Sequence, residues 1–411
     1  MQLFSDLHIH SKYSRACSKE ISIRTLAQGA KWKGINLLGT GDFTHPLWLK
    51  EIEENLIEFK QGSGLYIFSE IPEVLFVLSS EVNFIFQREQ KTKRVHFVVL
   101  TENIEKAKEI NKFLSFYGNL EADGRPTLTL DPKNFLKNAL EIDPEIILIP
   151  AHIWTPWFGI LGSFSGFDSI EECFEELTNE ILAVETGLSS DPLMNWQVEF
   201  LDKFAIVSFS DSHSSLPHRL GREATVFNLQ ELSFKGIRDA LKNKKIDFTI
   251  EFFPEEGKYH YDGHRNCGVS FSPEESEKIN NICPVCQRPL TIGVLHRVKK
   301  LGNRDPNKAP KKIPFFRLVP LSEIIAKTFG TSEWSNKVKD IYFSLVESFG
   351  TEYSILLDVP LNELQKVAPQ KLVLAIEKVR KSDLKIIPGY DGEYGKIEFR
   401  FDDGQKSLFS L

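Results

Sequence analysis

The chain is poor in cysteine and has no long apolar segment. Its 411 residues include five cysteines, a sparse and odd count that argues against a disulfide framework and favours a reducing compartment. No apolar run reaches the ~18 residues that a membrane span requires. Residues 1–6 lack the basic flank and apolar core of a secretion signal. We therefore expect a cytoplasmic protein with no membrane partner.

The composition is that of an ordinary globular protein. Hydrophobic residues make up 41% and charged residues 26% of the chain, which excludes a disordered, collagenous or coiled-coil protein. The length suits two to three domains of about 150 residues each. The formal net charge is −7, yet residues 288–317 contain nine basic residues and one acidic residue. Such a basic stretch is either a solvated linker or a surface that binds a polyanion.

Short apolar runs alternate with helical patterns over residues 1–252. The predicted strands are residues 3–8, 35–38, 74–79, 95–100, 146–150, 181–184, 205–208 and 225–228. Segments of helical period, such as 21–33 and 48–59, lie between several of them. This alternation predicts a parallel α/β sheet or barrel. Residues 1–252 therefore form the first predicted domain.

Two further regions follow this domain. Residues 253–312 are rich in glycine, proline, cysteine and histidine and have little apolar periodicity. Helical patterns return at residues 321–328, 334–348, 361–367 and 372–381. We predict a small separate module over 253–312 and a mainly helical C-terminal domain over 313–411.

Histidine, aspartate and glutamate gather at the predicted strand ends. His8 and His10 form a His-x-His pair in which both imidazoles face one side of an extended segment. In a β/α barrel the carboxyl ends of the strands converge on one mouth, so these residues would meet there. The candidate metal ligands are His8, His10, Asp42, His45, Glu81, His96, His152, Asp211 and His213. Glu185, after the strand at 181–184, is a further candidate.

This donor set suits a site with several divalent ions. The imidazoles and carboxylates exceed the needs of one tetrahedral ion, so two or three ions (Zn²⁺, Mn²⁺ or Mg²⁺) are predicted. A carboxylate such as Glu81 or Asp211 can bridge two ions. Clustered ions lower the pKa of a bound water toward ~7 and neutralise charge on a phosphate. The prediction is a site that can supply a metal-bound hydroxide as nucleophile, with Asp211, Glu81 and His10 as the catalytic candidates.

These motifs resemble the polymerase-and-histidinol-phosphatase (PHP) superfamily. The matching motifs are Asp6-Leu7-His8-Ile9-His10-Ser11, Gly41-Asp42-Phe43-Thr44-His45, Glu81, His96, Pro150-Ala151-His152 and Ser210-Asp211-Ser212-His213. The resemblance implies a distorted seven-stranded β/α barrel, (β/α)7, with a trinuclear metal site that hydrolyses phosphoesters. Most members have an adjacent Asp-His pair after the second strand. Here Asp42 and His45 are separated, so which of the two is the ligand stays open.

A second candidate metal site lies in residues 253–312. The preferred ligands are His264, Cys267, Cys283 and Cys286, with His260 and His296 as alternatives for the histidine. Three thiolates and one imidazole predict a closed structural Zn²⁺ site with no open position for catalysis. A metal would stabilise a region that is too short and polar to bury a core of its own. Residues 253–312 are therefore predicted to be a zinc-binding module.

The combination of barrel, zinc module and helical region resembles the endonuclease Q family of this superfamily. The resemblance rests on residues 261–269, 283–286 and 290–298 and covers nearly the whole chain. It implies a DNA-repair endonuclease that cuts the phosphodiester 5′ to deaminated bases (uracil, hypoxanthine, xanthine) and abasic sites. DNA containing such bases, flipped out of the stack, would be the partner, and the protein would be nucleoid-associated.

The alternative is a PHP-type phosphomonoesterase that acts on a small molecule. The zinc module and the basic stretch would be superfluous for that activity, which favours the endonuclease. The basic residues expected to meet DNA phosphates are Arg297, Lys299, Lys300, Lys311 and Lys312. The aromatic loop 154–158 either stacks on DNA or packs within the protein. Residues 405–411 mildly resemble a sliding-clamp motif.

Overall fold

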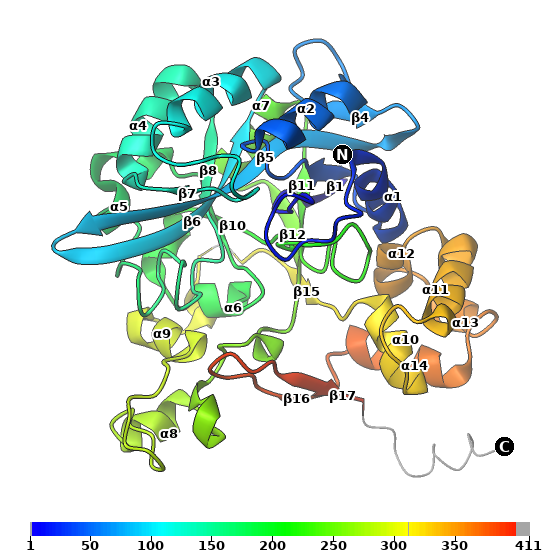
Figure 1. Cartoon of the computed structure of the whole chain (residues 1–411). Helices are drawn as coiled ribbons and strands as arrows, with labels where there is room; N and C mark the ends of the chain where they lie inside the picture. Colours follow the sequence, from blue (N-terminus) through cyan, green and yellow to red (C-terminus); the bar gives the residue numbers. More distant parts are fainter. Residues whose placement is uncertain (1, 311, 400–411) are drawn as a thin grey trace.

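The protein is a mixed α/β structure built around a central sheet (Figure 1), seen in a computed structural model that describes residues 2–310 and 312–399. The strands are β1 (Gln2–Asp6), β2 (Leu37–Gly39), β3 (Leu56–Glu58), β4 (Tyr66–Phe68), β5 (Ile71–Arg88), β6 (Lys91–Thr101), β7 (Thr127–Leu128), β8 (Ile147–Pro150), β9 (Ala183–Glu185), β10 (Ala205–Val207), β11 (Ala224–Asn228), β12 (Ile246–Glu251), β13 (Asp262–His264), β14 (Val269–Phe271), β15 (Phe315–Arg317), β16 (Lys385–Ile387) and β17 (Lys396–Glu398).

Fourteen α-helices accompany these strands within the described residues. They are α1 (Ile23–Lys33), α2 (Pro46–Asn55), α3 (Ile104–Leu114), α4 (Pro132–Ile142), α5 (Glu171–Phe174), α6 (Pro192–Asn195), α7 (Phe234–Lys242), α8 (Pro273–Lys278), α9 (Val294–Leu301), α10 (Leu321–Phe329), α11 (Asn336–Phe349), α12 (Glu352–Leu357), α13 (Leu361–Leu364) and α14 (Gln370–Arg380). No helix in this part of the chain is both long and apolar enough to cross a membrane.

Local sequence signals explain where the first helix begins and ends. The side chain of Ser22 accepts a hydrogen bond from the Thr25 amide, and the Thr25 side chain accepts one from the Ser22 amide, so the two residues form a capping box. Gly34 ends α1 with φ at 100°, a left-handed conformation that glycine adopts without steric cost. The apolar face between these caps packs into the core.

The central sheet is buried on both faces. Along β2 and β5, neighbouring residues belong to two different apolar clusters, as Leu37 and Val77 do on one face and Leu38 and Phe76 on the other. A strand covered on both sides needs an unbroken apolar run rather than an alternating one. The continuous hydrophobic runs of the sequence therefore have their explanation in this sheet.

The sheet is mixed rather than parallel throughout, which corrects the parallel pairing expected for residues 74–100. β5 extends to Arg88 and returns as β6 in a long antiparallel hairpin, with Glu81 opposite Val98. Glu81 therefore lies inside a strand, not at a strand end. β1–β2 and β2–β5 are parallel, whereas β6–β8 is antiparallel.

The segments that follow β1 and β10 lie side by side. Ile9 forms a parallel bridge with Ser212, and the His10 amide donates to the Ser212 carbonyl at 2.9 Å. The buried Asp6 carboxylate accepts from the Ser210 amide at 3.0 Å and from the Gly221 amide at 2.9 Å. Residues two hundred positions apart in the chain are thereby fixed at one end of the strands.

The helices α10 to α14 pack beside α1 (Figure 1). Lys33 at the end of α1 is buried, and its ammonium lies 2.7 Å from Glu352 Oε1 at the start of α12. Tyr342 donates a hydrogen bond to the other oxygen of Glu352 at 2.9 Å. A buried ion pair must have its remaining hydrogen bonds satisfied, and here both carboxylate oxygens of Glu352 have partners.

Candidate metal centre

Two groups of metal-type side chains meet at one carboxylate. The first group is His8, His10, Glu81 and Asp211, and the second is Glu81, His96 and His152. Within each group the ligand atoms, one from each residue, all lie within 4.8 Å of one another. These six residues are called the carboxylate–imidazole centre below.

Glu81 faces the two groups with different oxygens. Its Oε2 lies 3.5 Å from His8 Nε2 and 3.2 Å from His10 Nε2. Its Oε1 lies 2.6 Å from His96 Nδ1 and 3.2 Å from His152 Nε2. A carboxylate with one oxygen in each group has the placement of a ligand shared between two neighbouring ions. The position of Glu81 within β5, opposite β6, brings its oxygens to this point.

The ring of His8 is oriented so that one of its nitrogens can bind a cation. Its Nδ1 is 2.9 Å from Glu185 Oε1, at the end of β9. Its buried Nε2 has no hydrogen-bond partner among the residues that the structure describes and lies 3.6 Å from Asp211 Oδ1. A carboxylate on one ring nitrogen holds the proton there and leaves the lone pair of the other nitrogen for a metal. The donor set therefore fits a divalent ion.

Glu185 and Asp42 each orient a histidine of the centre. The Glu185 side chain also accepts from the His152 amide at 2.7 Å. Asp42 Oδ1 lies 3.0 Å from His10 Nδ1, and Asp42 Oδ2 accepts from the Ser11 amide at 2.6 Å. Both carboxylates are buried and lie behind the imidazoles rather than within either ligand group.

Two predicted ligands lie outside both groups. His45 is the N-terminal cap of α2, and its ring stacks on Tyr13 with centroids 4.2 Å apart. Burial lowers the pKa of His45. His213 lies beside the centre, with its ring centroid 4.6 Å from that of His10 and its Nδ1 3.7 Å from Asp211 Oδ1. Of the two residues that the sequence left open, Asp42 contacts a histidine of the centre and His45 does not.

The backbone is strained where three candidate residues leave their strands. Asp42, His152 and Asp211 have φ values of 46°, 32° and 49°. A left-handed backbone costs a residue other than glycine about 1–3 kcal/mol. The three residues follow β2, β8 and β10, so the strain gathers at the same place as the ligand atoms. Packing of the surrounding strands holds these side chains in position.

Arg125 enters the centre from the loop before β7. Its Nη1 donates to Glu81 Oε2 at 2.9 Å, and 29% of its side chain is exposed. The neighbouring carboxylate Glu81 raises the pKa of this guanidinium. No motif in residues 118–126 pointed to an arginine here, because the residue reaches the centre only through the course of the loop.

The charges of the centre are balanced between carboxylates and imidazoles. Burial opposes ionisation of Glu81, but His96 and Arg125 hold its pKa well below the usual value. Burial also opposes protonation of His8, yet Glu185 and Glu81 raise its pKa well above the usual value. Without a metal, protons on His8 and His10 offset part of the buried negative charge, whereas burial lowers the pKa of His96 to about 4. Divalent cations can replace these protons, so metal binding would release them.

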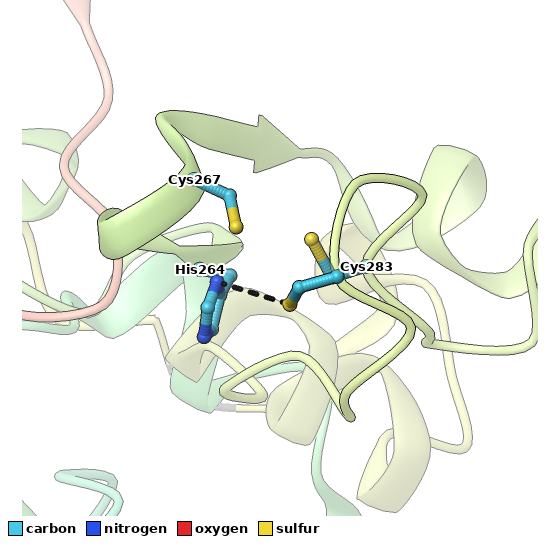
Figure 2. Close-up of side chains that lie close together, drawn as sticks. His264, Cys267 and Cys283 are labelled. Carbon is cyan, nitrogen blue, oxygen red and sulfur yellow. Dashed lines mark hydrogen bonds between the residues drawn. The ribbon is translucent and has the colours of Figure 1, made fainter.

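The four sulfur and nitrogen ligands predicted in residues 253–312 also lie together. They are His264, Cys267, Cys283 and Cys286, called the thiolate cluster below, and their ligand atoms lie within 4.8 Å of one another. Figure 2 shows the side chains of His264, Cys267 and Cys283 around a common centre. His264 Nδ1 is 3.7 Å from Cys286 Sγ. This donor set fits a tetrahedral Zn²⁺ ion.

The rival histidines lie outside this cluster. His296 Nδ1 is 2.5 Å from Asp262 Oδ2, which fixes the start of α9 against β13. His260 is buried, and burial lowers its pKa to about 4. Neither residue belongs to the thiolate cluster. Of the three histidines considered from the sequence, the fold brings His264 to the cysteines.

The basic stretch is only partly available at the surface. Arg297 is buried, and its guanidinium donates to the Leu161 and Phe167 carbonyls, each at 2.8 Å. It therefore holds the loop before α5 and does not face solvent, which corrects the prediction that it meets DNA. Lys299, Lys300 and Lys312 are exposed. Lys311 and the clamp-like residues 405–411 lie outside the described residues.

The aromatic loop 154–158 contains one buried ring and two partly buried rings. Trp154 is buried and donates to Asn195 Oδ1 at 2.8 Å. Trp157 stacks on Phe164 with centroids 4.7 Å apart, and Phe164 is 51% exposed. Of the two roles considered for this loop, packing therefore holds for Trp154.

Comparison with other proteins identifies related sequences over most of the chain. A family model described as the MJ0043 C-terminal domain matches residues 320–383. The chain is 33% identical over 252 residues to uncharacterized protein MJ0043 of Methanocaldococcus jannaschii, a match that covers 60% of the chain and 31% of MJ0043. The chain thus spans about a third of that relative. It is 27% identical over 418 residues to uncharacterized protein YqxK of Bacillus subtilis, covering 97% and 99% of the two chains.

Two crystal structures match the whole fold. One is the lesion-specific endonuclease PfuEndoQ from Pyrococcus furiosus, with a TM-score of 0.86 and 30% identity over 100% of both chains. The other is Endonuclease Q in complex with a 27-mer duplex substrate that has an abasic lesion at the active site. It has a TM-score of 0.86 and 31% identity over 97% of both chains. The similarity therefore includes the regions of both metal-type clusters.

Proposed function

This chain belongs to the endonuclease Q family, and we propose that it is a metal-dependent DNA-repair endonuclease. It hydrolyses the phosphodiester 5′ to deaminated bases (uracil, hypoxanthine, xanthine) and to abasic sites. The observation that carries the proposal is Glu81, whose two oxygens face two separate groups of ligands in a fold that matches lesion-cutting relatives along its full length.

The carboxylate–imidazole centre holds the divalent ions in this proposal. His8, His10 and Asp211 would hold one ion and His96 and His152 a second, with Glu81 available to both. When bound, such ions activate water for attack and neutralise charge on the phosphate. Asp42 and Glu185 keep the imidazoles in the orientation and tautomer that metal binding needs. His213, at the exposed edge, completes the centre or contacts the substrate.

DNA binds in this proposal across the exposed lysines Lys299, Lys300 and Lys312. Lysines that neutralise phosphates release counterions, so affinity should fall steeply as salt is raised. Lys299 already lies 3.0 Å from Glu274 and 3.1 Å from Glu277, so it must exchange these partners for phosphate. Accessible rings such as Phe164 offer a surface on which a base can stack.

The thiolate cluster holds one structural Zn²⁺ ion in this proposal. Its four ligands leave no open position for substrate, so the ion stabilises the module rather than taking part in cleavage. We also keep the three-part division of the chain at residues 1–252, 253–312 and 313–411. The second part is the zinc module and the third contains the helices α10 to α14.

A seven-stranded barrel is supported by the contacts around the first domain. Ladders join β1 to β2, β2 to β5, β5 to β6, β6 to β8 and β9 to β10. β8 contacts β9, and the Ile9–Ser212 bridge lies between the segments that follow β10 and β1. We infer that these seven strands close into the distorted PHP barrel, with the metal centre at its mouth.

A cleavage assay tests the proposed function. End-labelled duplexes with one uracil, one hypoxanthine, one abasic site or no lesion are incubated with Mn²⁺, with Mg²⁺ or with a chelator. We expect a metal-dependent nick immediately 5′ to each lesion and an intact undamaged duplex. Intact damaged duplexes, together with release of phosphate from a chromogenic phosphomonoester, would instead support the small-molecule phosphomonoesterase.

A further inference from the structure

We propose that Arg125 is a catalytic residue that binds a non-bridging oxygen of the scissile phosphate. The inference rests on the proposed function and adds a substrate contact that the sequence motifs do not contain. Arg125 is the guanidinium that contacts the shared carboxylate Glu81, and part of its side chain is open to solvent at the same point.

The loop that carries Arg125 is fixed against the metal centre. The Gly124 amide donates to the Tyr13 carbonyl at 3.2 Å, and the Arg125 amide donates to Asp123 Oδ1 at 3.0 Å. A Cβ atom on Gly124 would lie 2.2 Å from Asp42 Oδ2. Only glycine allows this approach, so the loop lies directly on the carboxylate that orients His10.

The guanidinium has donors left for a ligand. Nη1 is bound to Glu81, and among the described residues no second protein acceptor of the Arg125 side chain is found. An arginine carries five N–H donors in a planar fork that matches the oxygens of a phosphate. With 29% of the side chain exposed, the remaining donors can reach a substrate that enters the centre from solvent.

A purely structural role would be to neutralise Glu81. In that role the arginine would affect how tightly the centre holds metal, because Glu81 is the shared ligand. In the proposed role it contacts substrate, and its loss should weaken phosphate binding and slow cleavage while the metal content stays the same. The two roles therefore predict different metal contents and phosphate affinities for an Arg125 variant, and both can be measured without DNA cleavage.

The test compares Arg125→Gln and Arg125→Lys with the wild-type protein, each loaded with Mn²⁺. Metal content is measured by mass spectrometry, and binding of inorganic phosphate is measured by calorimetry. Cleavage of a uracil duplex is followed under single-turnover conditions. Arg15→Gln is the matched control, because Arg15 is exposed and its amide contacts the same Asp123 carboxylate at 3.3 Å.

We expect Arg125→Gln to keep its metal, to bind phosphate at least about tenfold more weakly and to cleave about 100- to 1000-fold more slowly, the range for loss of one charge-stabilising donor. Arg125→Lys should retain more activity than Arg125→Gln, because the charge remains but the fork is lost. Arg15→Gln should stay close to wild type.

Three results would overturn the inference. Loss of metal from Arg125→Gln would show that Arg125 acts only by neutralising Glu81. Unchanged phosphate affinity in this variant would show that Arg125 does not contact the substrate. An equal effect in Arg15→Gln would mean that the site responds to general charge. Failure of the proposed function looks different, because the wild-type protein itself would then leave lesion-containing DNA intact while phosphate binding could still depend on Arg125.

Discussion

The two metal-type clusters of this protein are built in opposite ways. The thiolate cluster draws its ligands from a short stretch, His264 to Cys286, around the hairpin of β13 and β14. The carboxylate–imidazole centre draws its ligands from His8 to Asp211, along several strands. The first uses soft thiolates, of which Cys283 is buried and two are partly exposed, and the second uses imidazoles and carboxylates that are mostly buried.

The difference shows what each cluster requires from the rest of the fold. A cluster whose ligands are close in sequence can form with little help, and metal binding then supplies folding free energy to a region with a small core. A centre whose ligands are distant in sequence forms only when the strands are already packed. The strands around this centre therefore contribute their own stability and can store strain at Asp42, His152 and Asp211.

The largest effect is expected from a ligand of the carboxylate–imidazole centre. Asp211→Asn removes a carboxylate that lies 3.1 Å from His10 Nε2. The loss of charge should weaken metal-assisted catalysis by several kcal/mol, or at least about 1000-fold in the cleavage rate. Single-turnover cleavage of a uracil duplex measures this change. The DNA affinity of Asp211→Asn should stay near that of the wild type. Asp239→Asn, at an exposed position of α7, is the control and should cleave like the wild type. Loss of DNA binding by Asp211→Asn would contradict the assignment.

The next largest effect is expected at the thiolate cluster, where a substitution should lower the local stability of the fold rather than the rate of cleavage. Cys283→Ser removes a buried ligand, so the protein should lose one equivalent of zinc and the segment from β13 to α9 should open more readily. Zinc analysis and amide hydrogen exchange follow both changes. Cys17→Ser, outside the cluster, is the control. Unchanged zinc content in Cys283→Ser would show that these four residues do not hold the ion.

A smaller effect, on metal affinity, is expected for a residue that contacts a candidate metal ligand without being one itself. Glu185→Gln keeps the shape of the side chain but weakens its hold on His8 Nδ1, and loss of such a partner lowers metal affinity about 10- to 100-fold. Competition with a chelator measures the affinity. Glu180→Gln, an exposed position in the turn before β9, should be unaffected. If both variants bind metal like the wild type, Glu185 has no orienting role.

The smallest effect tests a buried carboxylate, Glu256, that belongs to neither metal-type cluster. Burial, together with the nearby Glu323, raises the pKa of Glu256 from 4.5 to about 9. Folding then takes up a proton at neutral pH, so the free energy of unfolding should fall as pH rises between about 5 and 9. Glu256→Gln should flatten this dependence by a few degrees in melting temperature between pH 6 and pH 9. Parallel curves for the two proteins would show that Glu256 does not titrate in this range.

Much of the candidate site could be predicted from the sequence because the residue types themselves carry chemistry. His8, His10, His152 and Asp211 lie at or after the ends of apolar runs that form β1, β8 and β10, and the alternation of such runs with helices indicated the α/β class but not the antiparallel pairs of the sheet. The family resemblance is confirmed by 30% and 31% identity to solved structures over nearly their full length.

Other features depend on contacts between distant segments and had no local signal. Glu81 lies within the long β5–β6 hairpin, although its sequence context suggested a strand end. Arg297 looks like any other residue of the basic stretch, yet its guanidinium is buried against the loop carbonyls of Leu161 and Phe167. The charge and hydrophobic periodicity of a sequence indicate which residues are polar, but they do not indicate which residues a polar side chain contacts in the fold.

The sequence by itself determined the kinds of ligand, their order along the chain and the Cys283–Cys286 pair, because a short spacing fixes local geometry. Only the tertiary structure decided that Asp42 rather than His45 contacts a histidine of the centre, that Glu81 faces both ligand groups and that Arg125 reaches it. The physical reason is distance along the chain. Contacts across tens to hundreds of residues depend on how strands pair and loops pack, and no short motif encodes that packing.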